Sequence, residues 1–167
     1  LNNSGQTSLK IPAGAPSYYS GVVSARNSTR RPELAAPGGI DEGGTDRVAS
    51  ILAVDDSRSL RRMLKMTLEE AGHTVTEAED GASGVAKARQ QAFDLVLLDI
   101  NMPVMDGITV AARLRSLPEY ASTPILMLTT ESSAEKKKLG KEAGATGWIV
   151  KPFSPEKLVN VVNMLMG

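Results

Sequence analysis

Short runs of apolar residues, each closed by a polar residue, recur from residue 50 onwards. Because these runs are unbroken, they predict strands buried on both faces, as in a parallel sheet covered by helices. Ligands bind such sheets beyond the carboxyl ends of the strands, so the closing residues should share one edge. The runs and their closing residues are Ile51–Val54 before Asp55, Leu95–Leu98 before Asp99, Pro124–Leu128 before Thr129, and Trp148–Val150 before Lys151.

Between these runs the apolar residues take up helical spacing. Leu60, Leu64 and Leu68 would line one face of a helix that ends near Gly72, where glycine suits a C-cap. Ser154, followed by a proline and an acid, is a strong helix start signal. With a further strand near residues 74–78, strand and helix alternate five times. The pattern predicts an α/β fold, a doubly wound five-stranded parallel sheet with helices on both faces. The other helices are expected over 82–91, from Gly107, and over 133–143.

The first 49 residues differ from the rest of the chain in composition. They are rich in Gly, Pro and Ser and hold no periodic apolar pattern. Such a segment cannot bury enough apolar surface to offset the entropy of ordering it. We therefore interpret residues 1–49 as a disordered linker or tail, and residues 50–167 as one domain. Because the chain opens with Leu1 rather than Met, we expect a fragment or a processed product.

Composition removes several classes of function. Formal net charge is zero and there is no long basic block, which argues against a nucleic-acid partner. No stretch approaches the roughly 18–20 apolar residues that a membrane helix needs, so we expect no membrane insertion. The absence of cysteine excludes disulfides and thiolate metal sites. A cytoplasmic location is the default expectation.

The carboxylates at the ends of the predicted strands suggest a cation site. Asp55 and Asp56 follow the first apolar run, and Asp99 closes another. Like charges at ~4 Å in an effective dielectric of ~20 repel by roughly 4 kcal/mol per pair, so a cluster needs a compensating cation. Hard oxygen ligands without His or Cys point to Mg²⁺. The alternative is that these acids cap turns, and Asp56 or Ser57 could cap the helix that follows.

Asp99 is the candidate nucleophile. A carboxylate can attack phosphorus and form an aspartyl phosphate, a transfer that needs little beyond alignment and neutralisation of charge. The ammonium of Lys151 would supply positive charge, and Thr129 a hydroxyl donor to a phosphoryl oxygen. The bond between Lys151 and Pro152 is a candidate cis peptide, because the cis form of an X–Pro bond is only ~0.5–1 kcal/mol less stable than the trans form.

Four segments together resemble the receiver domain of two-component response regulators, most of all the single-domain chemotaxis type. The likeness covers about residues 50–167, with the order and spacing of that family. It implies a flavodoxin-like sheet of strand order 2-1-3-4-5. The segments are Val54-Asp55-Asp56-Ser57, Leu98-Asp99-Ile100-Asn101-Met102-Pro103-Val104-Met105-Asp106-Gly107, Leu128-Thr129-Thr130-Glu131 and Val150-Lys151-Pro152-Phe153.

The resemblance implies a role for each acid. Asp99 would accept a phosphoryl group from a phosphohistidine on a sensor kinase. Asp56, Asp99 and the backbone carbonyl of Asn101 would ligate Mg²⁺, and Asp55 would act through water. The chain would then be a signalling switch rather than an enzyme, with intrinsic phosphotransfer and autodephosphorylation.

The resemblance also assigns the residues that respond to the phosphoryl group. Thr129 and Lys151 would bind its oxygens, and Trp148 occupies the position of the aromatic switch residue. Asn101 and Glu131 match positions that tune hydrolysis in the family. A downstream protein partner would bind the face formed by the fourth helix, fifth strand and fifth helix.

Several alternatives remain open. The domain could be a free-standing chemotaxis-type regulator, or a receiver module of a hybrid kinase or other multidomain protein. A phosphohydrolase of the haloacid dehalogenase type would also use a strand-end aspartate, but it needs a second acid where Asn101 stands. A flavin-binding flavodoxin would want a phosphate loop after the first strand, where Asp55 and Asp56 would repel it.

Overall fold

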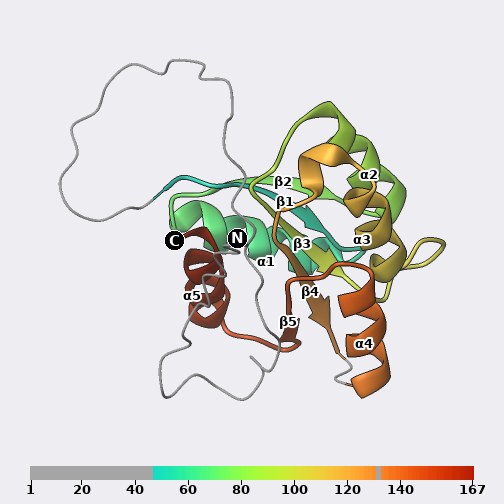
Figure 1. Ribbon diagram of the computed structural model, residues 1–167. Helices are drawn as coiled ribbons and strands as arrows, with labels where there is room; N and C mark the ends of the chain where they lie inside the picture. The colour runs from blue at the N-terminus through green and yellow to red at the C-terminus, as the bar shows by residue number, and fades with distance from the viewer. Residues whose placement is uncertain (1–46, 131–132) are drawn as a thin grey trace, which may run out of the picture.

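The computed structural model describes residues 47–130 and 133–167, in which strands and helices alternate along the chain (Figure 1). Most of the helices and strands begin and end within one residue of the expected positions. The elements are β1 (Ser50–Val54), α1 (Arg58–Glu70), β2 (Thr74–Ala78), α2 (Gly81–Gln90), β3 (Leu95–Asp99), α3 (Gly107–Arg115), the 3₁₀ helix η2 (Pro118–Tyr120), β4 (Ile125–Thr129), α4 (Ala134–Glu142), β5 (Gly147–Val150) and α5 (Pro155–Met166).

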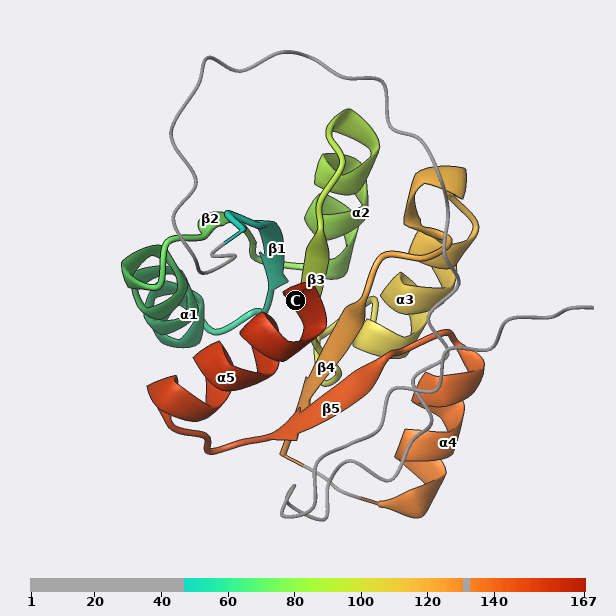
Figure 2. The ribbon, with the colours of Figure 1, turned by 60° about the vertical axis from the view of Figure 1, so that its left-hand side comes forward.

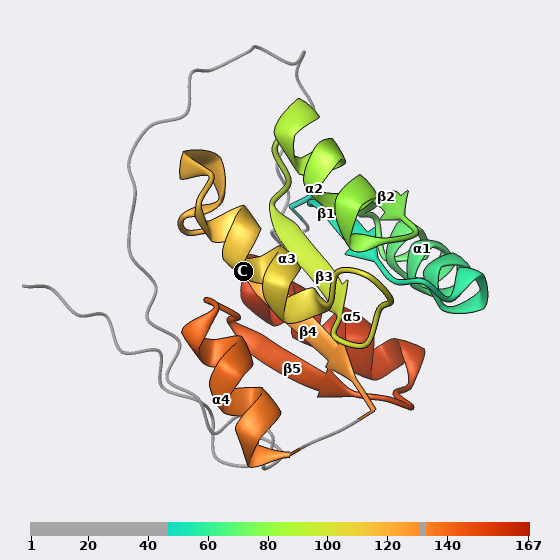
Figure 3. The ribbon, with the colours of Figure 1, turned by 90° about the vertical axis from the view of Figure 1, so that its right-hand side faces the viewer.

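The strands form one parallel sheet in the order β2-β1-β3-β4-β5, as expected. Helices α1 and α5 cover one face of the sheet, and α2, α3 and α4 cover the other (Figures 2 and 3). The chain therefore has the doubly wound, flavodoxin-like architecture. Because all strands run the same way, their carboxyl ends meet at one edge of the sheet.

The core consists of two apolar layers, one on each face of the sheet. Alternate residues of a strand point to opposite faces, so Leu52 and Val54 pack towards α2 and α3, whereas Ile51 and Ala53 pack towards α1 and α5. All five residues of β3 and all five of β4 are buried. Burial on both faces explains why the strands appear in the sequence as unbroken apolar runs.

Each α-helix begins with a side-chain oxygen that accepts a backbone N–H of the first turn, a cap that stabilises a helix by about 1 kcal/mol. Ser57 caps α1, which decides between the two candidates, Asp56 and Ser57. Ser154 caps α5 and Pro155 occupies its first position, as expected. The remaining caps are Asp80 for α2, Asp106 for α3 and Ser133 for α4.

Gly107 holds the start of α3 directly against the end of β3. A Cβ atom at this position would lie 2.2 Å from the backbone oxygen of Asp99, so a side chain cannot be accommodated without a shift of the backbone. The N–H of Gly107 donates to the carbonyl of Ile100 at 2.9 Å. This close approach fixes the loop that leaves the carboxyl end of β3.

Ala49, one residue before the proposed domain boundary at residue 50, packs in the core. Ala49 is fully buried, its N–H donates to His73 Nδ1 at 3.3 Å, and its carbonyl accepts the N–H of Thr74 at 2.9 Å. Residues 1–46 of the proposed linker lie outside the described residues. Within the described part of the chain, none of the helices is long and apolar enough to cross a membrane.

Candidate functional site

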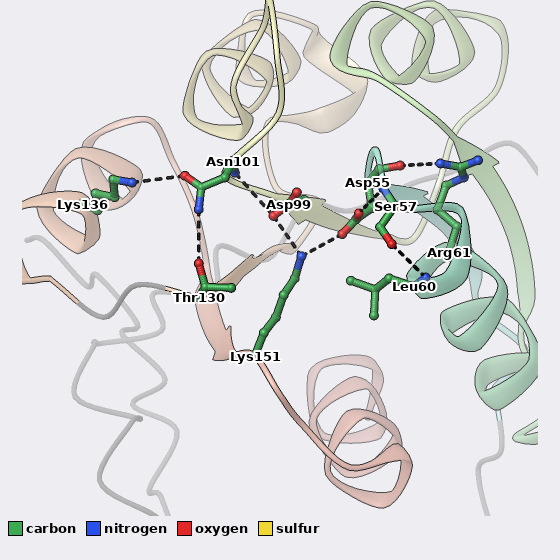
Figure 4. A network of polar contacts seen from close by, with 9 residues as sticks. All are labelled: Asp55, Ser57, Leu60, Arg61, Asp99, Asn101, Thr130, Lys136 and Lys151. Atoms are coloured by element: carbon green, nitrogen blue, oxygen red, sulfur yellow. Dashed lines mark hydrogen bonds and ion pairs between the residues drawn. The ribbon is translucent and has the colours of Figure 1, made fainter.

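A polar cluster lies where the strands end, and Lys151 is at its centre (Figure 4). Asp55 follows β1, Asp99 is the last residue of β3, and Lys151 follows β5. Lys151 Nζ donates to Asp55 Oδ2 at 2.9 Å and to Asp99 Oδ1 at 3.0 Å. Residues separated by 96 and 52 positions in the sequence are thereby brought into hydrogen-bond contact.

The Asp55 carboxylate is fully buried and held on both oxygens. Its Oδ1 accepts the N–H of Ser57 at 2.8 Å, while Oδ2 accepts Lys151. Arg61 of α1 fixes the backbone of the same residue, because its Nη1 donates to the Asp55 carbonyl at 2.7 Å. The arginine also pairs with Glu77 of β2 at 3.6 Å. Asp55 is therefore positioned from its own turn, from α1 and from β5.

The Asp99 carboxylate is also buried, and its proton affinity is altered. Burial, and after it the negative charge of Asp55, raises the pKa of Asp99 above its ordinary value; the hydrogen bond and charge of Lys151 and the N–H of Asn101 oppose this effect. Burial alone would lower the pKa of Lys151, but its hydrogen bonds to Asp55 and Asp99 and their charges raise it. Among the described residues, the donors to Asp99 both bind Oδ1, so Oδ2 is the oxygen that remains for a ligand.

Asp56 joins these two carboxylates in a cluster that could bind a cation. One oxygen each of Asp55, Asp56 and Asp99 lies within 4.8 Å of the others. Asp56 is exposed to solvent while the other two are buried, so the cluster is open on one side. Three hard oxygen donors of this kind suit Mg²⁺, which takes few carboxylates and keeps several waters. The residues present therefore fit the expected cation.

Asn101 connects the site to α4. Its N–H donates to Asp99 Oδ1 at 3.4 Å, and its side-chain Oδ1 accepts Lys136 Nζ at 3.1 Å. Its Nδ2 lies 3.5 Å from the hydroxyl oxygen of Thr130, which follows β4 (Figure 4). The exposed amide of Asn101 thus lies between β4, α4 and the acidic cluster.

Of the other predicted site residues, Thr129 lies at the same edge of the sheet, whereas Trp148 lies further back, near the start of β5. Thr129 is fully buried at the end of β4, and its carbonyl accepts the N–H of Lys151 at 2.7 Å. Trp148 of β5 is partly buried against the core, and its Nε1 is buried without a hydrogen-bond partner among the described residues. The peptide bond between Lys151 and Pro152 is cis. Glu131 lies outside the described residues.

Two residues in contact with the site were missed in the sequence. Arg61 was not singled out, although it follows Asp55 by six positions, which places it in the first turn of the helix after the acidic pair. Lys136 is the first of three consecutive lysines, and nothing in that run distinguishes it from the other two. Its contact with Asn101, 35 positions earlier, depends on how α4 packs, and no sequence signal specifies it.

Residues 51–163 match the response regulator receiver domain family. Among solved structures, the chemotaxis response regulator CheY4 of Vibrio cholerae is 50% identical and has a TM-score of 0.69. The match covers 71% of this chain and 98% of that one. A response regulator protein from Burkholderia multivorans is 49% identical, with a TM-score of 0.62, over 72% of this chain and 96% of that one.

A curated relative gives a different context for the same domain. The transcriptional regulatory protein ResD of Bacillus subtilis is 43% identical over 116 residues, which are 70% of this chain and 47% of ResD. The chain thus spans about half the length of the curated relatives it matches. The matched region, the strand order and the acidic edge of the sheet all lead to the same family. This chain belongs to the response regulator receiver domain family.

Proposed function

We propose that this chain is a phosphoryl-accepting switch of a two-component pathway, in which Asp99 receives its phosphoryl group from a phosphohistidine of a sensor kinase. The observation that carries the proposal is the Asp99 carboxylate itself. It is held by Lys151 on Oδ1 and adjoins two further acids, at the edge of the sheet where such folds bind ligands. The cytoplasmic location expected from the sequence is part of the same proposal.

In the proposed transfer, Asp99 Oδ2 attacks phosphorus and a P–O bond forms while the P–N bond of the phosphohistidine breaks. The electron pair of that bond returns to the imidazole. Negative charge accumulates on the phosphoryl oxygens, and the Lys151 ammonium, 3.0 Å from Asp99 Oδ1, is placed to offset it. Thr129, at the end of the adjacent strand β4, would donate its hydroxyl to a phosphoryl oxygen.

Mg²⁺ would supply the remaining positive charge when bound. Asp56, Asp99 and the backbone carbonyl of Asn101 are the proposed direct ligands. Asp55 is assigned a role through water, because both of its oxygens already accept hydrogen bonds from Ser57 and Lys151.

Phosphorylation would then change the surface formed by α4, β5 and α5, where a downstream protein binds. Two contacts support this choice of surface. Lys136 of α4 reaches Asn101 beside the acceptor, and the indole of Trp148 in β5 packs beneath Gly140 of α4. A shift at the site would therefore reach α4 from two directions, with Trp148 as the switch residue.

The likeness to CheY4 over nearly all of that protein favours a chemotaxis-type regulator. A receiver module within a longer protein is the second candidate, favoured by the match to only about half of ResD. In either case the acyl phosphate would be lost by intrinsic hydrolysis, which Asn101 and Glu131 would tune.

The test is intact-mass spectrometry of the chain after incubation with acetyl phosphate and Mg²⁺. We expect one added phosphoryl group that is labile to base. No group should be added when a chelator replaces Mg²⁺ in the incubation. Asp99→Asn should remain unlabelled, whereas the matched control Asp106→Asn, which replaces the cap of α3, should be labelled normally. Undiminished labelling of Asp99→Asn would place the nucleophile elsewhere and overturn the proposal.

A further inference from the structure

Lys136 makes a contact that nothing in the proposed transfer requires. Its ammonium extends from the first turn of α4 to Asn101 Oδ1 at 3.1 Å, while Asn101 Nδ2 faces Thr130 (Figure 4). We name the set Lys136, Asn101 and Thr130 the amide bridge. The amide bridge lies on the solvent-exposed side of the site, and Asn101 is two residues beyond Asp99 in the chain.

The chemistry of the partners fixes the orientation of the amide. An ammonium can only donate hydrogen bonds, so the carbonyl oxygen of the Asn101 side chain must face Lys136. The amide nitrogen then faces the hydroxyl of Thr130. Lys136 therefore donates to the amide oxygen of Asn101, which is the atom of this side chain that could accept a hydrogen bond from water.

The position of Lys136 on α4 distinguishes it from its neighbours. Its backbone N–H donates to the cap residue Ser133 at 3.3 Å, which fixes this residue in the first turn. Lys138 lies two positions further along, so it projects from a different side of the helix. Lys138 is exposed, whereas Lys136 is partly buried. The run of three lysines thus contains one residue directed to the site and a natural control.

We infer that Lys136 is a positioning residue that prolongs the phosphorylated state by occupying the Asn101 side-chain oxygen. The inference rests on the proposed function. In hydrolysis, the oxygen of water forms a bond to phosphorus and the bond from phosphorus to Asp99 Oδ breaks. Its electron pair returns to the carboxylate, and a proton of the water passes to the departing phosphate.

The contact determines the direction of the effect. A water molecule near phosphorus needs a hydrogen-bond acceptor to orient it for attack, and the exposed Asn101 oxygen lies two residues from the acceptor aspartate. Because the charged ammonium of Lys136 already donates to this oxygen, the oxygen is less available to accept a hydrogen bond from water. Removing the ammonium frees the oxygen, and hydrolysis becomes faster.

The experiment measures the lifetime of the acyl phosphate in the full chain. The protein is phosphorylated with acetyl phosphate and Mg²⁺, the donor is removed, and the decay is followed by intact mass. We expect Lys136→Met to decay about three- to tenfold faster, the factor that corresponds to the net loss of one ordinary hydrogen bond. Lys136→Arg, which restores a cationic donor, and Lys138→Met should decay at the rate of the unmodified chain.

A double-mutant cycle separates the amide bridge from a general effect of charge. If Lys136 acts through the amide, Lys136→Met should have no further effect in an Asn101→Ala background. An unchanged lifetime in Lys136→Met, or the same acceleration in both backgrounds, would overturn the inference. Melting temperatures of all variants should agree, because Asn101 is exposed and Lys136 is only partly buried, so neither side chain belongs to the core.

The failure of this inference can be told apart from the failure of the proposed function. If the unmodified chain takes up no phosphoryl group on Asp99, the proposed function is wrong and no lifetime exists to measure. If it is labelled and the Lys136→Met lifetime is unchanged, the proposed function stands and the role of Lys136 is wrong.

Discussion

Lys151 should be the residue that keeps the acidic cluster compatible with a stable fold when no divalent cation is present. Its side chain is 18% exposed and contacts two carboxylates, of which that of Asp55 is 0% exposed and that of Asp99 6%. Lys151→Met keeps an unbranched apolar stem of similar length but removes the ammonium. Two buried negative charges then lose their neutralising partner, a change that destabilises proteins strongly.

The structure sets the size of the effect. At separations of 2.9 and 3.0 Å, each ion pair contributes a gross attraction of about 5–6 kcal/mol at an effective dielectric of ~20. Burying the ammonium costs several kcal/mol, which offsets much of this attraction. We therefore expect Lys151→Met to lower the free energy of unfolding by about 3–4 kcal/mol at pH 7 in chelator, within the range for breaking a buried pair.

The loss should depend on pH in a defined direction. The pKa of Asp99 is raised in the folded chain, so the folded state holds this proton at pH values where the unfolded state has released it. Stability from this group is present below the ordinary value of 3.8 and is lost as pH rises through the folded pKa. The hydrogen bond and the positive charge of Lys151 lower the pKa of Asp99, so removing Lys151 raises this pKa further. The difference between variant and unmodified chain should therefore be large at neutral pH and shrink towards pH 4.

Urea unfolding in chelator at pH 7 and pH 4 measures both effects. Lys138→Met, a change on the exposed surface of α4, is the matched control and should unfold like the unmodified chain. Adding Asp99→Asn to Lys151→Met should recover part of the loss, because one of the uncompensated charges is removed. Equal stability of Lys151→Met and the unmodified chain at pH 7, or a loss that does not change with pH, would refute the reasoning.

Two further substitutions test local features. Val104, fully exposed with φ of 68°, is the centre of a tight turn in which Met105 N–H donates to the Pro103 carbonyl. Val104→Asn should raise the free energy of unfolding by about 1 kcal/mol, because left-handed backbone is costly for a β-branched residue and Asn tolerates it. Val48→Asn, also exposed, is the control in urea unfolding, and equal effects of the two would contradict the assignment of strain. At Gly140, an added Cβ would lie 3.1 Å from Trp148 Cζ2, so Gly140→Ala should displace the indole and change its fluorescence spectrum. It should also gain less than the ~1 kcal/mol that alanine brings to a helix interior. Lys141→Ala is the control, and an unchanged Trp148 emission in Gly140→Ala would show that the two residues do not limit each other.

The strands and their order of appearance could be predicted because one physical requirement produces one visible pattern. A strand covered by helices on both faces must be apolar along its buried length, and β1, β3 and β4 are apolar except for one terminal residue each, Ser50, Asp99 and Thr129. The polar residue after each strand then falls at the common edge without further information. This is why Asp55, Asp99 and Lys151 could be placed together before their distances were known.

Features that depend on packing between distant elements could not be predicted in the same way. Ala49 was assigned to the tail because Gly- and Pro-rich sequence precedes it, yet its burial depends on His73 and Thr74 at the start of β2. The contact between Lys136 and Asn101 depends on the position of α4, and that between Gly140 and Trp148 on how closely α4 approaches β5. A lysine or a glycine in a helix has many other uses, so neither residue type marks its contact.

Both of these contacts involve α4, which has fewer buried residues than any other α-helix in the described part of the chain. Within this fully described helix Gly140 is the one buried residue, whereas α5 buries Leu158, Val161 and Val162. A helix that buries little apolar area gains little from holding one position, so small changes in its few contacts can shift it. One such contact reaches Asn101, close to Asp99, and the other reaches Trp148 in the adjoining strand. Under the proposed function, this weak anchoring would suit α4 to respond to a charge added at Asp99, and it supports a partner surface that includes α4 rather than α1.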